Sequence, residues 1–280
     1  TSWSLPLHRG VACEQVDERL PELEAAWRPL DGAFALPGAG APLPAGAWGA
    51  AFPANENEAF RAAFLALRAG LPVERTMAAA DVGDAALPAG SFVVRAGPGG
   101  AGGGLAALLA ALAVPPVVLD AEPAVARRPL ATPRVGLVET WFHDIDAGWT
   151  RYVLDEYGLP FTVLRPADIP ARDLAKEFDV LVFPSSDKEA LLSGRFKTED
   201  ASYLPDLPPE FCKGLGPKGM ERLLAFADQG GIIVAWGRSC ELFLGVQEIK
   251  RGKDEIEAFK LPVDDVGDRL AAKGLSVTRS

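Results

Sequence analysis

The sequence predicts an α/β protein. Its second half, residues 133–280, is expected to form a doubly wound parallel sheet, and residues 1–132 a looser, irregular α/β portion. Two observations predict this fold class. Short runs that are apolar throughout recur in the second half, and stretches of helical periodicity with short turns separate them. Strands that are apolar on both faces are typical of parallel sheets covered by helices on each side.

In the first half, a helix is predicted over residues 58–69, because apolar residues recur there at helical spacing: Phe60, Phe64 and Leu67. Asn55 or Asn57 is expected to cap this helix, and Gly70 to end it. Two glycine- and proline-rich segments, 37–49 and 97–104, predict loops. The other elements expected in this half are strands over 71–76, 91–95 and 117–119, and an almost wholly apolar helix over 105–113.

The second half follows a linker expected over residues 129–133. Its predicted strands are residues 135–139, 161–164, 180–183 and 232–236, and its predicted helices are residues 148–157, 174–178 and 218–228. The lysine- and glutamate-rich stretch around residues 255–257 is expected to be solvated surface. In a sheet of this kind, ligands bind beyond the carboxyl ends of the strands.

Composition disfavours several classes of function. The 280 residues carry 28 basic and 38 acidic side chains, a formal charge of −10, and no dense basic cluster, so nucleic-acid binding is not expected. The longest apolar run, 105–119, contains two prolines and is too short to span a membrane. Three cysteines without C-x-x-C spacing, Cys13, Cys212 and Cys240, predict neither a disulfide framework nor a cysteine zinc site. The chain does not begin with methionine, and we expect it to be a piece of a longer protein.

Polar and aromatic residues follow the first predicted strand of the second half: Trp141, His143, Asp144, Asp146 and Trp149. They predict either a ligand-contacting patch or a simpler arrangement. In the simpler arrangement Asp144 or Asp146 caps the next helix and the tryptophans pack between helix and sheet. Because the carboxyl ends of parallel strands share one edge, the Trp236–Arg238 turn is expected to join this patch, with Arg238 in reach of Asp144 or Asp146.

A second motif has the spacing G-x-G-x-x-G, formed by Gly97, Gly99 and Gly102, and Asp120 ends a strand further on. Such glycines can bring a pyrophosphate to a helix N-terminus while the acid binds the ribose. However, a run so rich in glycine matches this spacing by chance, and Pro98 lacks an N–H that a phosphate needs. A mobile loop without nucleotide is therefore the first expectation.

Several segments resemble a bacterial zinc carboxypeptidase-like family: residues 133–137, 146–151, 156–161, 167–169 and 178–182, together with 3–7 near the start. The match is dense over 133–185 and 214–263 and loose over 8–130. In that family this stretch lies downstream of the peptidase domain, in a region similar to class I glutamine amidotransferases. The resemblance implies a flavodoxin-like fold for residues 133–280 and an upstream peptidase domain as partner. It is compatible with a secreted or periplasmic protein but leaves the compartment open.

The chemistry of both enzymes is missing from this chain. Neither His8 nor His143 begins the H-x-x-E motif that a zinc peptidase needs, so zinc is expected only in the upstream domain. Counting from Gly230 and Gly231 puts Trp236 where an amidotransferase carries its nucleophilic cysteine, and no histidine follows position 143.

The first functional hypothesis is therefore a non-catalytic accessory module of a zinc carboxypeptidase-like protein, without a metal or cofactor of its own. A nucleotide-binding domain that uses the Gly97–Gly102 motif is the second hypothesis. A hydrolase that combines Cys240 or Cys212 with His143 is the third, although Cys240 is expected to be a small buried residue.

Overall fold

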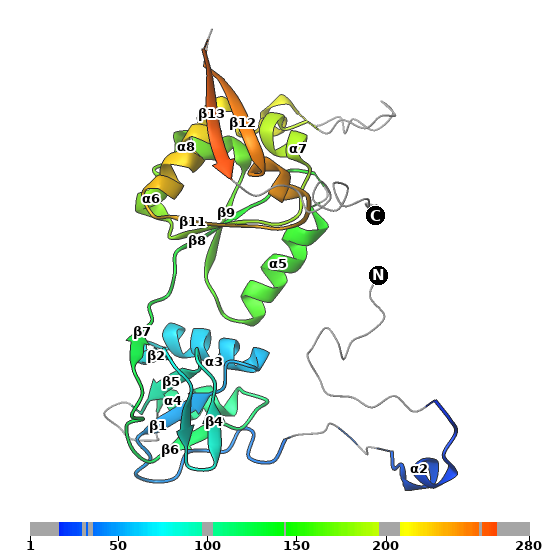
Figure 1. Cartoon of the computed structure of the whole chain (residues 1–280), viewed down its shortest axis with the longest axis vertical. Coiled ribbons are helices and arrows are strands. Elements are labelled where there is room, and N and C mark those ends of the chain that lie inside the picture. Colours follow the sequence, from blue (N-terminus) through cyan, green and yellow to red (C-terminus); the bar gives the residue numbers. More distant parts are fainter. Residues whose placement is uncertain are drawn as a thin grey trace. The chain divides into compact units, whose positions relative to one another are not determined.

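The computed structural model describes residues 17–29, 32, 36–96, 103–142, 144–195, 208–251 and 254–261, with side chains up to residue 244. The chain forms two compact units, residues 1–37 and 38–280. The predicted boundary between residues 132 and 133 falls within the second unit, at the point where the chain leaves one sheet and enters another (Figure 1). The division into domains at that point stays a prediction.

The first unit contains one short helix, α2 (Pro21–Ala26), in its described part. Pro21 occupies the first turn, where its missing N–H costs no hydrogen bond. The Arg19 guanidinium donates two hydrogen bonds, of 2.7 and 2.8 Å, to the Glu24 carboxylate at the surface. All of α2 is exposed, so the helix buries no core of its own.

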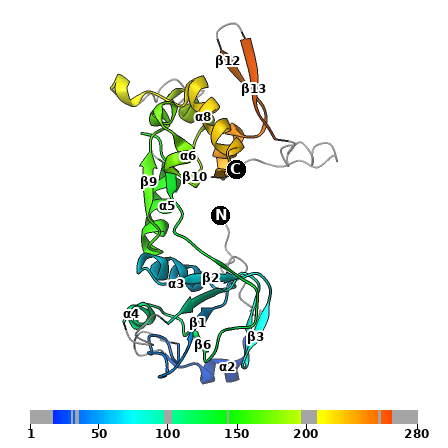
Figure 2. The same cartoon turned by 90° about the vertical axis from the view of Figure 1, so that its left-hand side faces the viewer.

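The first half of the second unit is built on a five-stranded sheet of order β6-β1-β5-β2-β7, with every pair antiparallel. Its strands are β1 (Gly49–Phe52), β2 (Val73–Thr76), β5 (Phe92–Arg95), β6 (Val117–Leu119) and β7 (Arg127–Pro129). A separate hairpin joins β3 (Ala80–Val82) to β4 (Ala85–Leu87). Figure 2 shows this sheet together with the two helices of the same half. The sequence predicted β2, β5 and β6 within two residues, but not β1, β7 or the hairpin.

The two helices of this half are α3 (Asn57–Arg68) and α4 (Gly104–Ala110). The buried stripe of α3 consists of alanines: Ala59, Ala62, Ala63 and Ala66. Phe60 is only partly buried, and packs edge-to-face on Phe92 at 5.1 Å. The predicted cap is wrong, because Glu56 occupies the N-cap position and no side chain caps the helix. The alanines of the buried stripe are small, so the backbone of α3 can lie close to the sheet.

The second half contains a four-stranded sheet of order β11-β10-β8-β9, with every pair parallel. Its strands are β8 (Val135–Val138), β9 (Phe161–Leu164), β10 (Val180–Phe183) and β11 (Ile232–Ala235). This confirms the α/β class and the parallel sheet. Each strand begins at the predicted residue and ends within one residue of the predicted end. Runs that are apolar throughout predict such strands well, because both faces of a parallel sheet can be covered.

One face of the parallel sheet packs on the largest core cluster of the second half. The cluster includes Val138, Leu164, Leu181 and Phe183 from the strands. Its cover comes from η1 (Pro166–Ala171), α6 (Leu174–Glu177) and α8 (Gly216–Asp228). The helix α5 (Ile145–Glu156) lies on the opposite side of the sheet (Figure 1). Among the described elements, several helices cover the first side of the sheet and α5 covers the second.

The remaining described elements of this half are α7 (Lys188–Ser193), η2 (Pro209–Phe211), η3 (Gly237–Leu242), β12 (Gly245–Arg251) and β13 (Asp254–Leu261). β12 and β13 form an antiparallel hairpin, in the stretch where solvated surface was expected. In the described part of the chain, no helix is long and apolar enough to cross a membrane.

Candidate functional site

The carboxyl edge of the parallel sheet is the part of the molecule where a site is expected. Four loops reach it, one after each strand, at residues 139–144, 165–168, 184–187 and 236–239. The strands are in parallel register from Val135 opposite Val180 to Phe183 opposite Ala235, so their ends lie at one edge. Polar and aromatic side chains dominate these loops.

Asp144 connects two of the loops. Its Oδ2 accepts hydrogen bonds from the backbone N–H and the hydroxyl of Thr140, at 2.6 and 2.7 Å. Its Oδ1 accepts a hydrogen bond of 3.1 Å from the hydroxyl of Ser186, in the loop after β10. Asp144 occupies the N-cap position of α5, as the simpler interpretation expected, but its side chain makes no capping bond. The carboxylate therefore connects the loops after β8 and β10 and does not cap the N-terminus of α5.

Ser239 continues this network to the loop after β11. Its hydroxyl is fully buried, donates to the carbonyl of Pro184 and accepts a 2.9 Å hydrogen bond from the Ser186 N–H. The backbone N–H of Arg238 donates to the Ser185 hydroxyl at 3.2 Å. The segments after β8 and after β11 are thus joined through the loop after β10, which lies between them.

Arg238 forms a salt bridge with Asp187. Asp187 also caps α7, accepting from the N–H groups of Glu189 and Ala190 at 2.9 and 3.1 Å. The expected partner of Arg238 was Asp144 or Asp146. The structure gives Arg238 the nearer acid on β10's loop, which lies directly beside β11 in the sheet. The sequence could not distinguish these acids, since the choice depends on strand order.

A second cluster lies beside the first and is centred on Arg165. Its guanidinium stacks on the Trp141 ring at 3.8 Å from the ring centroid, and donates to the Glu139 carbonyl at 3.2 Å. The Glu139 carboxylate lies 3.4 Å from Arg151 and 3.6 Å from Arg165. Trp141 also packs edge-to-face on Phe211 at 4.7 Å. Sequence reasoning missed Arg165, whose signal was its place directly after a predicted strand.

The tryptophans are more exposed than the simpler interpretation expected. Trp141 is 45% exposed and Trp149 is 65% exposed, so neither is packed away between helix and sheet. Trp149 contacts Tyr152 edge-to-face at 5.9 Å, on the outward side of α5. The backbone carbonyl of Asp146 accepts from Thr150 within the same helix. His143 lies outside the described residues.

The turn after β11 bends at a glycine in the left-handed conformation. Trp236 is extended, with φ −143°, whereas Gly237 has φ +56°, in the left-handed region. A Cβ built on Gly237 would lie 2.6 Å from the Cβ of Ser185, which is closer than real contacts allow. Cys240, in the following turn, donates from its thiol to the Ala235 carbonyl at 3.4 Å. The residue at the bend of this turn therefore has no side chain and no room for one.

The buried polar side chains of the described residues are all hydrogen-bonded. No buried side-chain nitrogen or oxygen among them lacks a hydrogen-bond partner. Nor do histidine, cysteine and acidic side chains gather into a potential metal site in this part of the chain. A network whose members are all paired rigidifies the structure that carries it. Hydrogen bonds thus join the loops of the carboxyl edge to one another, and the exposed rings of Trp141 and Trp149 lie at its side.

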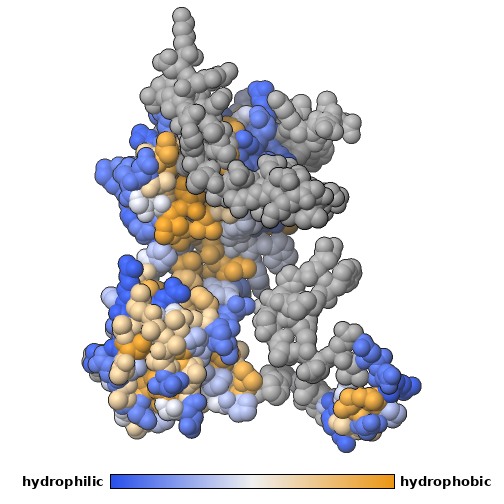
Figure 3. Space-filling view, in the orientation of Figure 1, coloured by the Kyte–Doolittle hydropathy of each residue, from blue (hydrophilic) through white to orange (hydrophobic). Residues whose placement is uncertain are grey.

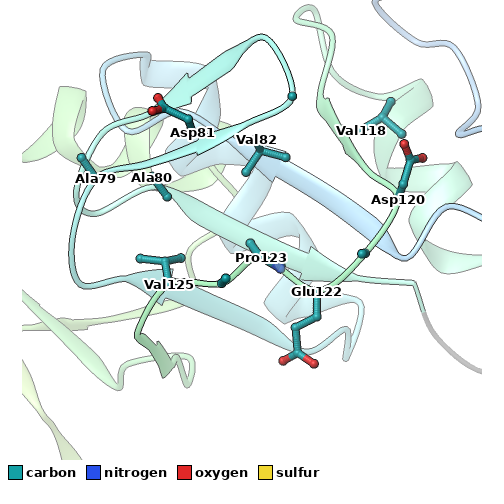
Figure 4. A pocket seen from close by; sticks show the side chains of 12 residues that line it. Ala79, Ala80, Asp81, Val82, Val118, Asp120, Glu122, Pro123 and Val125 are labelled. Carbon is teal, nitrogen blue, oxygen red and sulfur yellow. The ribbon is translucent and has the colours of Figure 1, made fainter.

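The glycine motif of the first half, Gly97, Gly99 and Gly102, lies outside the described residues. Asp120 follows β6 and is exposed, at an open cavity of about 670 Å³ (Figure 4). The cavity lies between β3 and the segment 118–125, and Glu122 on its wall pairs with Arg127. The surrounding sheet is antiparallel, with β1 between β5 and β6, whereas dinucleotide-binding folds use a largely parallel sheet.

Comparisons with protein-family models, with curated proteins and with solved structures give no match to this chain.

Proposed function

We propose that residues 133–280 form a flavodoxin-like, amidotransferase-like domain that acts as a non-catalytic accessory module of a zinc carboxypeptidase-like protein. The order of the parallel strands supports the finer fold assignment. Numbered along the chain from β8, they lie in the order second, first, third, fourth. Flavodoxin-like sheets begin with the same order. The sequence segments 133–137 and 146–151 support the family.

One observation carries the non-catalytic part of the proposal, namely the Trp236–Gly237 turn. Enzymes that attack a carbonyl with a nucleophile on a strand-to-helix bend place that side chain on the strained residue itself. Here the left-handed residue is Gly237, and Ser185 fills the space that a side chain would need. The residue before it, Trp236, has no nucleophilic atom. A chain with this turn binds or stabilises but does not form an acyl intermediate there.

The side chains around the turn support the accessory role. The acids and serines of the carboxyl edge are joined to one another, as in the Asp144–Ser186 and Arg238–Asp187 pairs. The exposed residues at the side, Trp141 and Trp149, offer apolar area instead of reactive groups. In this proposal the patch contacts the upstream peptidase domain, which would hold the zinc, and the module supports folding, assembly or substrate access.

The proposal is tested by an assay for ammonia release from glutamine. The wild-type chain is expected to be inactive, and Cys240→Ser is expected to change nothing. Ammonia release that disappears in Cys240→Ser would overturn the non-catalytic assignment and favour the cysteine hydrolase. The upstream coding sequence is a second test. An H-x-x-E motif with a distal histidine is expected there.

Nucleotide binding is the alternative, and calorimetric titration with NAD or ATP separates it from the first proposal. No binding is expected. Micromolar affinity that is lost in Gly99→Val and weakened in Asp120→Asn would reverse the order of the two proposals.

A further inference from the structure

β11 has one free side in the described part of the chain, because it is the last strand in the order of its sheet. Its side chains alternate in burial. Ile233 and Ala235 pack against the core cluster, whereas Ile232, Val234 and Trp236 are 56%, 43% and 36% exposed. Figure 3 shows apolar residues gathered on the surface over this part of the sheet. An apolar edge strand of this kind is a template for pairing with another strand.

The hydrogen bonds between β11 and β10 determine which backbone groups of β11 can pair with another strand. The N–H of Ile232 donates to the Asp179 carbonyl at 3.0 Å, and the N–H of Trp236 to the Phe183 carbonyl at 3.3 Å. In a parallel ladder, every second residue directs both backbone groups to the same neighbour. Ile233 and Ala235 therefore direct their N–H and C=O groups to the free side.

We propose that β11 pairs antiparallel with β11 of a second copy of this chain, about a two-fold axis at Val234. In this register Ile233 lies opposite Ala235 of the copy, and each pair exchanges two hydrogen bonds, which uses all four outward-directed groups. The Ala235 carbonyl already accepts from the Cys240 thiol, and its second lone pair is the one that the copy would use. Neighbouring registers are poorer. A shift in one direction places Ala235 opposite Gly231, and a shift in the other places Ile233 opposite Gly237, beyond the strand.

The same register matches the exposed side chains. Val234 lies opposite Val234 of the copy, and Ile232 lies opposite its Trp236. Aromatic and β-branched pairs of this kind are favourable across antiparallel strands. Two four-stranded sheets then become one continuous sheet, and neither copy keeps this free edge.

Charge favours a second copy as the partner. Residues 231–237 contain no charged side chain, so two identical strands meet without a like-charge pair although the whole chain carries −10. Arg238 directly follows the strand and is already paired with Asp187 of its own copy, so it adds no unpaired charge at the end of this edge. Two-fold symmetric pairing is also the commonest arrangement of oligomers.

Disulfide cross-linking tests the register in a chain whose native cysteines are replaced: Cys13→Ser, Cys212→Ser and Cys240→Ser. In that background Val234→Cys is expected to form a covalent dimer under mild oxidation, because the two Cα atoms would lie about 4.5 Å apart. Ile232→Cys is the matched control. It is more exposed, but its counterpart in the copy would lie about 13 Å away, so this variant is expected to form no covalent dimer. A mixture of Ile232→Cys and Trp236→Cys chains is expected to cross-link.

Equal cross-linking of the two single variants, or none in either, would overturn the proposed register. Sedimentation tests the association itself. The wild-type chain is expected to dimerise as its concentration rises, and more tightly at higher salt, which screens the repulsion between acidic copies. Val234→Lys is expected to weaken the dimer at least about tenfold. Thr162→Lys, on the edge strand β9 at the other side of the sheet, is expected to leave it unchanged. A wild-type chain that stays monomeric at all concentrations would mean that a different protein or chain segment occupies this edge.

Discussion

β1 and β11 show how little the composition of a strand says about its burial. β1 has the sequence Gly-Ala-Ala-Phe and is buried at all four positions. β11 has the sequence Ile-Ile-Val-Ala, is far more apolar, and is exposed at Ile232 and Val234. β1 lies between two strands and under the alanines of α3, whereas β11 lies at the end of its sheet. Position in the sheet determines burial, and excess apolar area at an edge points to a partner.

The largest expected effect contrasts one side chain from each strand. Phe52 in β1 is 1% exposed, and Phe52→Ala is expected to lower the free energy of unfolding by about 3–5 kcal/mol, since it leaves a cavity in a packed core. Ile232→Ala in β11 is expected to cost less than about 1 kcal/mol in the monomer. Urea unfolding of both variants at low protein concentration measures the difference. Equal losses would show that the β11 face is covered in the monomer.

A second contrast uses two glycines of the second half. A Cβ on Gly136, in the central strand β8, would lie 2.7 Å from Leu181 Cδ2 and 2.8 Å from Leu164 Cδ1. Gly136→Ala is therefore expected to destabilise by about 1–3 kcal/mol through overpacking. A Cβ on Gly148 in α5 meets no atom within 4 Å, and Gly148→Ala is expected to stabilise by about 0.5–1 kcal/mol. Thermal unfolding gives both signs, and a neutral Gly136→Ala would contradict the packing argument.

The turns at the two ends of β11 give a third, smaller contrast. Gly230 and Gly237 both have positive φ, so alanine at either is expected to cost about 1–2 kcal/mol. Only Gly237→Ala also meets Ser185, and it should cost more than Gly230→Ala. If the two variants unfold alike, the turn after β11 has room for a side chain, and the argument against a nucleophile there is lost.

The smallest effect concerns the opposite edge of the parallel sheet, where Asp179 pairs with Arg134 at 2.6 Å. Hydrogen bonds from the Arg134 side chain hold the pKa of Asp179 below its ordinary value. A carboxylate whose pKa is lowered on folding stabilises the protein above its unfolded pKa, near about 3.9, and this stability is lost as the pH falls through the folded pKa.

Asp179→Asn should therefore be less stable than the wild type at pH 7, and the difference should vanish in acid. Both side chains are about half exposed, so the effect is expected to be modest and to shrink in about 1 M salt. Unfolding midpoints of both chains between neutral and acidic pH provide the measurement. A difference that stays constant over this range would show that the ion pair does not cause it.

The sequence predicted the parallel sheet well because its strands are continuous apolar runs. Such runs are typical of strands that are covered on both faces. It failed at β1 because two alanines after a glycine- and proline-rich segment carry no strand signal. It failed at the role of Asp144 for another reason. The acid has the right spacing for a cap, yet Thr140 and Ser186 take its oxygens. Thr140 is a local partner, but Ser186 is 42 positions away in the loop after another strand, and that contact could not be predicted from the sequence around Asp144.

The candidate site could be placed in the sequence, at the ends of strands, but its pairs could not. Arg238 bonds to Asp187, 51 positions away, because their strands are neighbours. Arg165 was overlooked, although it organises Glu139 and Trp141 through three separate contacts. An arginine directly after a strand of a parallel sheet therefore indicates a site at the carboxyl edge as well as aromatic and acidic residues do.

The hairpin of β12 and β13 begins and ends at nearly the same place in the structure. Gly245 lies opposite Leu261 in its register, so the two ends of the excursion are about 5 Å apart. A segment with adjacent ends can be exchanged for a short turn, or for a longer guest sequence, without pulling on the strands that precede it. The hairpin lies beside α8, whose surface would be uncovered by such a deletion. This makes the hairpin a natural position for a fluorescent or affinity label.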